Sequence, residues 1–301
     1  MRKTVVLMCC LILCIFIQSG SAAGWKPKLI IGIVPEADLA KQMEVYVPLC
    51  RYLGMKLDYQ VEVKPLKNHG LIFEELKNSQ IDAGFFGSFI YAMTHERIGL
   101  VPVARPVKTD GDSMLRGATF VRKDSNIHSP KDMKGKVIAL VDPATTTGYL
   151  AQKLYFKKYG LDIDKDVKII WATNHDRAVM MVYEKKADMG GASDHAFEKA
   201  VSAYPALKEG LIILDTSREV PGSTFAVDIS MDVQLRARLT NVLLEMGSDP
   251  AAQDILKKLD TKRFVKTTHE EYGGLYKMAK EGAINLKTYP YRREDHQVGT
   301  K

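Results

Sequence analysis

Three hydroxyl side chains follow one another at Thr145, Thr146 and Thr147. They come after a run of apolar residues, 137–141, that predicts a buried strand, and before a segment with helical spacing, 149–156. We therefore expect the threonines at a strand-to-helix turn. The start of a helix presents unpaired N–H groups and the positive end of the helix dipole, so hydroxyl donors beside it make a candidate seat for a small oxyanion. The alternative is that one threonine caps the helix and the others fill the turn.

Motifs of several enzyme classes are missing from the sequence. It has no Gly-x-Ser-x-Gly elbow, no Gly-x-x-x-x-Gly-Lys phosphate loop, no His-Glu-x-x-His pair and no paired cysteines that could hold a metal ion. Asp194 and His195 could supply two metal ligands, but a metal site needs three or four and no companions stand out. We therefore expect a binding protein rather than an enzyme, with no metal ion and no cofactor.

The composition is that of a globular protein with a mild excess of positive charge. The chain has 301 residues, of which 46% are hydrophobic and 26% are charged. That length is enough for one large or two ordinary domains. The formal charge of +7 includes Arg2 and Lys3 at the very start of the chain. The lysines are scattered and do not form an array with aromatic residues, so we expect a small anionic ligand and no nucleic acid partner.

The N-terminal segment has the three parts of a secretory signal peptide. Arg2 and Lys3 are followed by the apolar run 4–17 and by small residues up to Ala23, where we expect cleavage. The alternative, a membrane anchor, has an apolar core of roughly 14 residues, short of the about 20 that span a bilayer. We therefore expect residues 1–23 to be removed and the mature protein to be exported.

Three of the four cysteines, Cys9, Cys10 and Cys14, lie in this signal segment. Cys14 follows Leu13, where the cleavage site of a lipoprotein has a small residue, so we expect no lipid on it. The mature chain keeps Cys50 alone, which cannot form an internal disulfide. Its surroundings have helical spacing and predict a small core residue rather than a reactive thiol.

Strands and helices alternate along the first third of the chain. Residues 28–34 are apolar on both faces, which predicts a strand in a covered, largely parallel sheet. Asp38 can cap the helix that follows, up to Leu53. This alternation is typical of a doubly wound α/β fold, in which ligands lie at the carboxyl ends of the strands. The pattern continues with a strand, a helix, a strand and a helix at 58–63, 70–77, 81–86 and 89–97.

A polar segment with a glycine, 109–113, interrupts this pattern, and the same alternation then begins again. A second polar junction, 216–223, is followed by a further strand and a long amphipathic helix. A chain that leaves one lobe, builds another and returns has two crossovers and a cleft between its lobes. The later strands are expected at 117–122, 136–141, 167–171, 188–192 and 224–228, and the later helices up to Tyr159 and at 176–186, 195–202, 233–246, 251–259 and 270–280.

These features predict the fold class and the division of the chain. We expect two doubly wound α/β lobes joined by two crossover strands. Lobe 1 takes residues 24–108 and 224–287, and lobe 2 takes residues 109–223. Residues 288–301 are polar and lack an apolar face, so we expect a flexible tail there.

Four fragments, taken together and in their order, resemble one known family, the periplasmic phosphonate-, phosphite- and phosphate-binding proteins of ABC importers. The resemblance extends from Gly32 to about Tyr276, which is nearly the whole mature chain. It implies the type II solute-binding fold, in which two α/β lobes close over a ligand, in agreement with the alternation of strands and helices. The fragments lie at 81–91, 118–136, 142–149 and 173–179.

The resemblance also implies which residues bind the ligand. Thr145, Thr146 and Thr147 occupy the place of a Ser-Thr-Ser run that binds the oxyanion in the family. All three hydroxyls are kept, and the extra methyl groups narrow the space. Two tyrosines of the family correspond to Tyr91 and, on the first helix, to Tyr46. For both tyrosines the alternative is core packing at helical spacing.

A histidine and an acidic residue complete the implied site. The family histidine matches His175, although Asn174 stands where the family usually has a threonine directly before the histidine. Otherwise His175 is a capping or surface residue. The acidic residue matches Asp194, whose carboxylate would favour a ligand that brings a proton, such as a P–OH group or an amine. The alternative for Asp194 is to cap the helix that begins at His195.

The function that the resemblance implies is capture of a small phosphorus oxyanion and its delivery to an ABC permease in the inner membrane. We expect a monomeric periplasmic protein whose closed state holds the ligand between the threonine lobe and the tyrosine lobe. The threonines do not choose among phosphate, phosphite and methylphosphonate, which share three P–O groups. Two alternatives stay open: a sulfonate or other small anion as the ligand, and a sensory solute-binding module that signals to a membrane partner.

Overall fold

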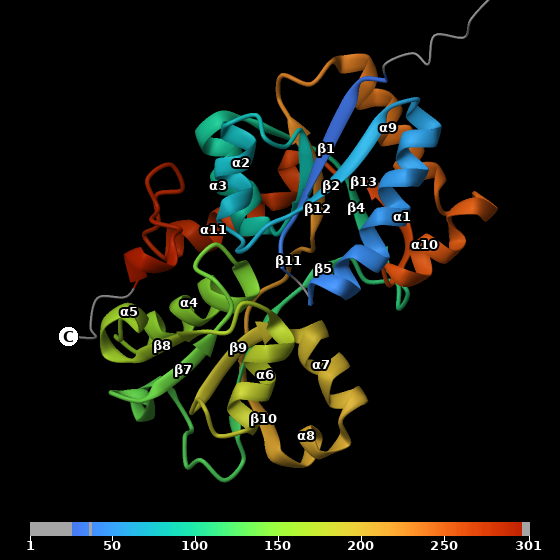
Figure 1. The fold of residues 1–301 in the computed structure, drawn as a ribbon. Coiled ribbons are helices and arrows are strands. Elements are labelled where there is room, and N and C mark those ends of the chain that lie inside the picture. Colours follow the sequence, from blue (N-terminus) through green and yellow to red (C-terminus); the bar gives the residue numbers. More distant parts are fainter. Residues whose placement is uncertain (1–25, 36–37, 297–301) are drawn as a thin grey trace, which may run out of the picture.

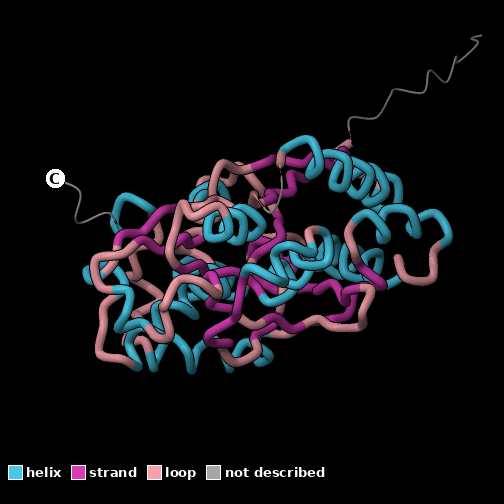
Figure 2. Tube along the Cα trace, turned by 90° about the horizontal axis from the view of Figure 1, so that it is seen from below, coloured by secondary structure: helices cyan, strands magenta, loops and turns pink. Residues whose placement is uncertain are grey.

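The computed structural model describes residues 26–35 and 38–296 and consists of two α/β lobes (Figure 1). Seen from below, the strands run through the middle of the molecule with helices outside them (Figure 2). The expected signal peptide, residues 1–23, and Cys14 lie outside the described residues. None of the helices in the described part of the chain is long and apolar enough to cross a membrane.

Lobe 1 is built on a six-stranded sheet with the strand order β13-β4-β12-β3-β1-β2. β1 pairs in parallel with β2 and β3, whereas β12 runs antiparallel to β3 and β4, and β13 runs antiparallel to β4. The sheet is therefore mixed rather than largely parallel, because the chain returns from lobe 2 to insert β12 near its centre. The strands are β1 (Lys28–Ile33), β2 (Gln60–Pro65), β3 (Ala83–Phe86), β4 (Leu100–Lys108), β12 (Thr224–Asp228) and β13 (Thr261–Lys266).

Six helices cover the two faces of this sheet (Figure 1). One face carries α1 (Leu39–Leu57), α9 (Val233–Glu245) and α10 (Gln253–Lys258), and the other carries α2 (Leu71–Lys77), α3 (Ser88–Ile98) and α11 (Gly273–Glu281). Leu29, Ile31 and Ile33 of β1 pack on the α1 side, and Ile30 packs on the α2 side. Side chains alternate along a strand, so an all-apolar strand requires a core on both faces.

Helix α1 begins where the sequence predicts. The side chain of Asp38 accepts a hydrogen bond from the backbone N–H of Lys41 at 3.1 Å. The helix continues past Leu53 and ends at Leu57. Cys50 is buried on its core face, and burial raises the pKa of its thiol to about 12. Such a thiol stays protonated at neutral pH, which agrees with a packing role.

Lobe 2 is built on a five-stranded sheet with the strand order β10-β6-β9-β7-β8. β7 runs parallel to β8 and β9, and β6 runs antiparallel to β9 and β10. Its strands are β6 (Gly117–Arg122), β7 (Val137–Leu140), β8 (Lys168–Trp171), β9 (Met189–Ser193) and β10 (Leu211–Thr216). Its helices are η2 (Thr146–Leu150), continued by α4 (Ala151–Lys158), then α5 (Ile163–Asp166), α6 (His175–Tyr183), α7 (Asp194–Ala203) and α8 (Pro205–Gly210).

The chain passes between the lobes at two places. β4 leads into the polar segment 109–113 and the short strand β5 (Met114–Leu115). The return passes through β11 (Val220–Pro221), which pairs with β5 in an antiparallel two-stranded sheet. The two crossovers are therefore held to each other by hydrogen bonds between the lobes.

Within the expected flexible tail, 288–301, the described residues 288–296 pack against the rest of the molecule, whereas 297–301 lie outside the described residues. Tyr289, Tyr291 and His296 are buried, and the guanidinium of Arg97 on α3 donates to the carbonyl of Tyr289 at 2.6 Å. The ring of Tyr291 lies 5.4 Å from that of Phe73 on α2. Isolated aromatic residues supply these contacts without any helix or strand period, which is why the sequence shows no apolar face.

The same segment continues onto lobe 2, where it ends in η5 (Arg293–His296). Nδ1 of His296 lies 3.1 Å from Oδ1 of Asp164 and 3.1 Å from the hydroxyl of Tyr149. Burial acts to raise the pKa of Asp164, but the hydrogen bond with His296 and the charge of Lys153 lower it to about 2. We call residues 286–296 the C-terminal strap, because they contact both lobes.

Candidate functional site

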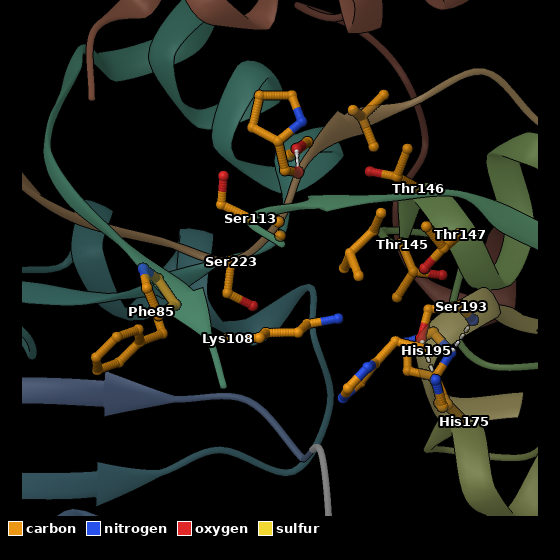
Figure 3. A pocket seen from close by; sticks show the side chains of 18 of the residues that line it. Phe85, Lys108, Ser113, Thr145, Thr146, Thr147, His175, Ser193, His195 and Ser223 are labelled. Carbon is orange, nitrogen blue, oxygen red and sulfur yellow. Dashed lines mark hydrogen bonds between the residues drawn. The ribbon is translucent and has the colours of Figure 1, made fainter. Parts of the chain in front are cut away.

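A cavity of about 360 Å³ lies between the two lobes (Figure 3). On the side of lobe 2, its lining comes from the carboxyl ends of β7, β8 and β9, where each strand leads into a helix. On the side of lobe 1, Gly87, Ser88 and Ile90 line it after β3. Ligands of doubly wound sheets bind at this position, at the carboxyl ends of parallel strands. The lobe 2 residues of the lining are Ala144, Thr145, Thr146, Thr147, His175, Asp176, Ser193, His195, Ala196 and Lys199.

Four helices begin at this cavity: η2 with α4, α6 and α7 in lobe 2, and α3 in lobe 1. Each helix start carries unpaired N–H groups and a partial positive charge of roughly half an elementary charge. Because the four starts face one space, their fields add there. The cavity therefore favours a small anion.

The three threonines are buried side chains that differ in their hydrogen bonds. The hydroxyl of Thr145 donates to the carbonyl oxygen of Asp142 at 2.7 Å, so its hydrogen is engaged. The hydroxyl oxygen of Thr146 accepts from the N–H of Phe89 at 2.9 Å, which leaves its hydrogen for another acceptor. Among the described residues, the hydroxyl of Thr147 has no hydrogen-bond partner. The run therefore offers two hydroxyl donors to a ligand.

Thr145 takes the N-cap position of η2 without a side-chain capping bond. Its backbone carbonyl instead accepts from the N–H of Leu150 at 3.1 Å, five residues on. A helix that opens with this wider spacing is a π-helix, a form that is frequent at functional sites. The wide first turn keeps the hydroxyls of Thr146 and Thr147 on the cavity side of the turn (Figure 3).

Asp142 fixes the turn that precedes the threonines. Its side chain is 1% exposed, and its Oδ1 accepts from the N–H of Ala144 at 3.0 Å. Its backbone carbonyl accepts from the N–H of Thr145 at 3.0 Å. The remaining carboxylate oxygen pairs with Nε of Arg293 in the C-terminal strap at 3.0 Å. The position of the threonine run therefore depends on a residue at the far end of the chain.

The lobes meet directly at the threonines. The N–H of Phe89, at the start of α3, reaches across to Thr146, and the hydroxyl of Ser88 donates to the carbonyl of Pro221 in the return crossover. A movement that separates the lobes breaks the first of these bonds. The start of α3 is thus the part of lobe 1 that closes over the threonine seat.

His175 is the first residue of α6 and lines the cavity. Its Nδ1 accepts from the N–H of Ser193 at 3.1 Å, so the neutral ring carries its hydrogen on Nε2. Asn174 is the N-cap of the helix, which places the histidine inside the first turn. Thr173 before it has φ of 76°, a strained conformation for a β-branched residue.

Aromatic side chains form the lobe 1 wall of the cavity. Tyr46, Phe85 and Phe264 all line it. The ring of Phe85 lies 5.4 Å from that of Tyr46 and 6.4 Å from that of Phe264. Tyr46 is thus both part of the wall and packed on a neighbouring ring. This wall provides apolar contact for whatever substituent a ligand carries.

Tyr91 does not line the cavity, contrary to the expectation for this residue. It is fully buried, its hydroxyl lies 3.0 Å from Nδ1 of His269, and its ring centroid lies 4.2 Å from that of Tyr272, with the two rings tilted by 39°. Burial raises the pKa of its phenol far above the ordinary value. The side of α3 that carries Tyr91 packs against α11 and the turn before it, so the core-packing alternative holds.

Asp194 also lies outside the lining. Its Oδ1 accepts from the backbone N–H groups of Arg116, at 3.2 Å, and His195, at 2.8 Å. Ser193 performs the capping, because its hydroxyl oxygen accepts from the N–H of Ala196 at 3.2 Å. Bonds to the backbone thus hold the Asp194 carboxylate beside the crossover instead of in the cavity.

Several lining residues were not anticipated as ligand contacts. Lys108 and Ser113 lie in the outgoing crossover and Ser223 in the return crossover, and the sequence marks both segments only as polar. Ser193 and His195 flank the predicted Asp194, so the strand-to-helix junction was correct and the side chain was not. Within the part of the chain that the structure describes, no cluster of three or more histidine, cysteine or acidic residues could hold a metal ion.

The sequence matches a known family model and, at low identity, known proteins. Residues 31–272 match the family model described as "ABC transporter, phosphonate, periplasmic substrate-binding protein". The phosphate-import protein PhnD of Mycolicibacterium smegmatis is 24% identical over 239 residues, 76% of this chain and 74% of that protein. The phosphonates-binding periplasmic protein of Escherichia coli K12 is 20% identical over 233 residues, with coverages of 76% and 69%.

Solved structures confirm the two-lobed type II fold. The binding protein component of an ABC phosphonate transporter from Pseudomonas aeruginosa superposes with a TM-score of 0.77, at 18% identity over 86% of this chain and 87% of that one. PhnD1 from Prochlorococcus marinus, in complex with methylphosphonate, gives 0.74 at 17% identity over 84% and 97%. Since the family model spans most of the sequence, this chain belongs to the family of periplasmic substrate-binding proteins of phosphonate ABC transporters.

Proposed function

We propose that the cavity between the lobes binds a small phosphorus oxyanion, with its oxygens against Thr146, Thr147 and the N–H groups at the start of η2. The observation that carries this proposal is the convergence of four helix starts and two available hydroxyl donors on one buried space. His175, whose Nδ1 accepts from the N–H of Ser193, lines the same side of the cavity. The names of the relatives, a phosphate importer and a phosphonates-binding protein, agree with such a ligand.

The working cycle is closure of the lobes around the ligand. Residues 24–108 and 224–287 form one body and residues 109–223 the other, and the two crossovers act as the hinge. The threonines hold the ligand on one body, and the start of α3 holds it on the other, so that only the closed state makes both sets of contacts. The protein acts as an exported monomer that binds without catalysis, meets no nucleic acid, and delivers its ligand to a membrane permease.

Calorimetric titration of the mature protein tests this proposal. The protein is unfolded and refolded to remove any carried ligand, and is titrated with phosphate, phosphite, methylphosphonate, 2-aminoethylphosphonate and sulfate. We expect a dissociation constant of about 1 µM or lower, about 8 kcal/mol of binding free energy, for at least one of the phosphorus compounds. Absence of heat with all five would overturn the oxyanion assignment.

A pair of substitutions locates the binding heat in the molecule. Thr146→Val keeps the shape of the side chain and removes the hydroxyl, and we expect it to weaken binding by about tenfold or more. Thr240→Val is the matched control, because the hydroxyl of Thr240 donates to the carbonyl of Arg236 within α9, away from the cavity. Equal effects of the two substitutions on affinity would place the ligand elsewhere.

A further inference from the structure

A lysine enters the cavity from the crossover. Lys108 is the last residue of β4, and Figure 3 shows its side chain extending from the lobe 1 wall, past Ser223, toward Thr145 and His195. It is a different group from the threonine seat, which belongs to lobe 2 and donates only through neutral hydroxyls and N–H groups. The cavity therefore has a neutral anion seat and, apart from it, a positive charge at Lys108. Lys199, which also lines the cavity, lies 3.9 Å from Oδ2 of Asp260.

The charge of Lys108 is only partly compensated. The residue is half-buried, and desolvation lowers the pKa of its amino group, against the influence of four aspartates. Among the described residues, no carboxylate lies within ion-pair distance, 4.0 Å, of this amino group. A half-buried cation without a direct counter-ion gains stability when an anionic group enters the same space.

Two of the four aspartates near Lys108, Asp260 and Asp194, are already engaged with other donors. Oδ1 of Asp260 accepts from the hydroxyl of Thr109 at 2.7 Å, and its Oδ2 lies 3.5 Å from Nε2 of His195 and 3.9 Å from Nζ of Lys199. Asp194 accepts from two backbone N–H groups and lies outside the lining. Asp194 and Asp260 are thus engaged with other donors, whereas Lys108 has no carboxylate within ion-pair distance among the described residues and is placed to bind an acidic group.

The cavity is also larger than a bare oxyanion needs. A volume of about 360 Å³ corresponds to roughly a dozen water molecules at about 30 Å³ each. A phosphate ion has five heavy atoms. Besides the threonines, the lining includes the aromatic residues Phe85 and Phe264 and, in the outgoing crossover, Lys108.

We infer that the natural ligand carries a second acidic group which Lys108 receives, so that the substrate class is a phosphonate with a carboxylate on its organic substituent. This inference rests on the proposed function, because it takes the threonine seat as the place of the phosphorus group. The carboxylate pairs with the lysine, and the short carbon chain between the two groups lies against the aromatic wall. Lys108 is then the residue that sets the specificity for the organic substituent.

The ranking of ligands by the wild-type protein tests this directly. We expect phosphonoacetate or 3-phosphonopropionate to bind about tenfold or more tightly than methylphosphonate, which has the same phosphorus group without the carboxylate, because a charge-assisted hydrogen bond is added. 2-Aminoethylphosphonate should bind more weakly than methylphosphonate, since its ammonium group meets the lysine. A wild-type protein that prefers the aminoalkyl compound, or binds the carboxylated ones no better than methylphosphonate, overturns the inference.

A charge-removing variant assigns the effect to the lysine. Lys108→Met should weaken binding of the carboxylated compound by about tenfold and of methylphosphonate by less than about threefold. Lys266→Met removes a charge from an exposed residue of β13 in the same sheet and should change neither value. Equal losses for both ligands in Lys108→Met also overturn the inference.

The outcomes separate this inference from the function beneath it. If methylphosphonate binds and requires Thr146, but the carboxylate adds nothing, then the substrate class is wrong and the oxyanion seat stands. If no phosphorus compound binds the wild-type protein, the proposed function itself fails. Should Lys108→Met not fold, the ranking of ligands by the wild-type protein still decides.

Discussion

At the scale of single residues, the hydrogen-bond donors of the site and its positive charge come from different side chains. Thr146 and Thr147 provide hydrogens from uncharged groups, so an oxyanion can be held without a buried cation directly beside it. The hydroxyl of Thr145 donates a hydrogen bond to the backbone carbonyl of Asp142 and so stabilises the turn. Three identical side chains therefore have two different roles, and the difference comes entirely from their hydrogen-bond partners.

Tyr91 offers a test of this division between ligand contacts and packing residues. Tyr91→Phe removes the hydroxyl that lies 3.0 Å from Nδ1 of His269 and keeps the ring contact with Tyr272. We expect a loss of about 1 kcal/mol in the free energy of unfolding, the usual value of one such hydrogen bond. Ligand affinity should stay within about twofold, since the ring lies outside the cavity. Urea unfolding and calorimetry measure the two quantities, and a large fall in affinity would return Tyr91 to the binding site.

The position of Tyr91 could not be derived from the sequence for a physical reason. Residues 88–94 of α3 are all buried. A helix that is apolar all round has no periodicity that distinguishes its cavity side from its core side. Asp194 presents a different difficulty: β9 ends in a serine, an aspartate and a histidine follow it, and any of the three can take part in capping or ligand contact. The junctions were predictable because strand and helix patterns fix them, whereas side-chain directions depend on packing partners far along the chain.

At the scale of elements, the strand-to-helix turn before α4 depends on close packing at Gly148. A Cβ atom at this position would lie 2.5 Å from Cγ2 and 2.6 Å from Cβ of Val141, and 3.0 Å from Oγ1 of Thr145. All three distances are shorter than normal contacts. The glycine thus allows the helix start to approach the end of β7, where the threonines must lie.

Gly148→Ala is therefore expected to destabilise the protein by about 1–3 kcal/mol through overpacking and to weaken ligand binding, because the turn must shift. Gly273→Ala is the matched control. It also adds a methyl group at a helix start, but no atom lies within 4 Å of the new Cβ. Its stability should be unchanged or higher by up to about 1 kcal/mol. Equal thermal stabilities for the two variants would show that the turn adapts without cost.

The elements that the sequence did not predict include one edge strand of each sheet. β13 stands at one end of the lobe 1 sheet and β10 at one end of the lobe 2 sheet. Along β13 only Thr261 and Phe264 are buried, and Ile212 and Ile213 of β10 are exposed. These two edge strands contact the core with few side chains, so their sequences carry a weak pattern. The central strands β1, β7 and β9 are buried along most of their length and were readily predicted.

At the scale of the whole molecule, the C-terminal strap packs against both lobes and connects them. One core cluster includes Phe89 of lobe 1, Tyr149 of lobe 2, and Tyr289 and Tyr291 of the strap. The strap is tied to α3 through Arg97 and to the threonine turn through Arg293. The end of the chain is therefore part of the structure that positions the site.

Two adjacent arginines of the strap allow this to be tested. Arg293 pairs with Asp142, whose side chain is 1% exposed, while Arg292 pairs with Glu74 at 2.9 Å and is 62% exposed. Arg293→Gln leaves a buried carboxylate without its cation, so we expect a loss of about 2–4 kcal/mol in the free energy of unfolding. Binding of methylphosphonate should weaken as well, because Asp142 fixes the turn that carries the threonines.

Arg292→Gln removes the same charge one residue earlier and is expected to cost less than about 1 kcal/mol, with no change in affinity. Urea unfolding of both variants gives the stabilities, and titration with methylphosphonate gives the affinities. If the two substitutions have equal effects on both quantities, the strap merely covers the surface of lobe 2. A larger loss of stability and affinity in Arg293→Gln alone means that the C-terminal residues hold the oxyanion seat in place through Asp142.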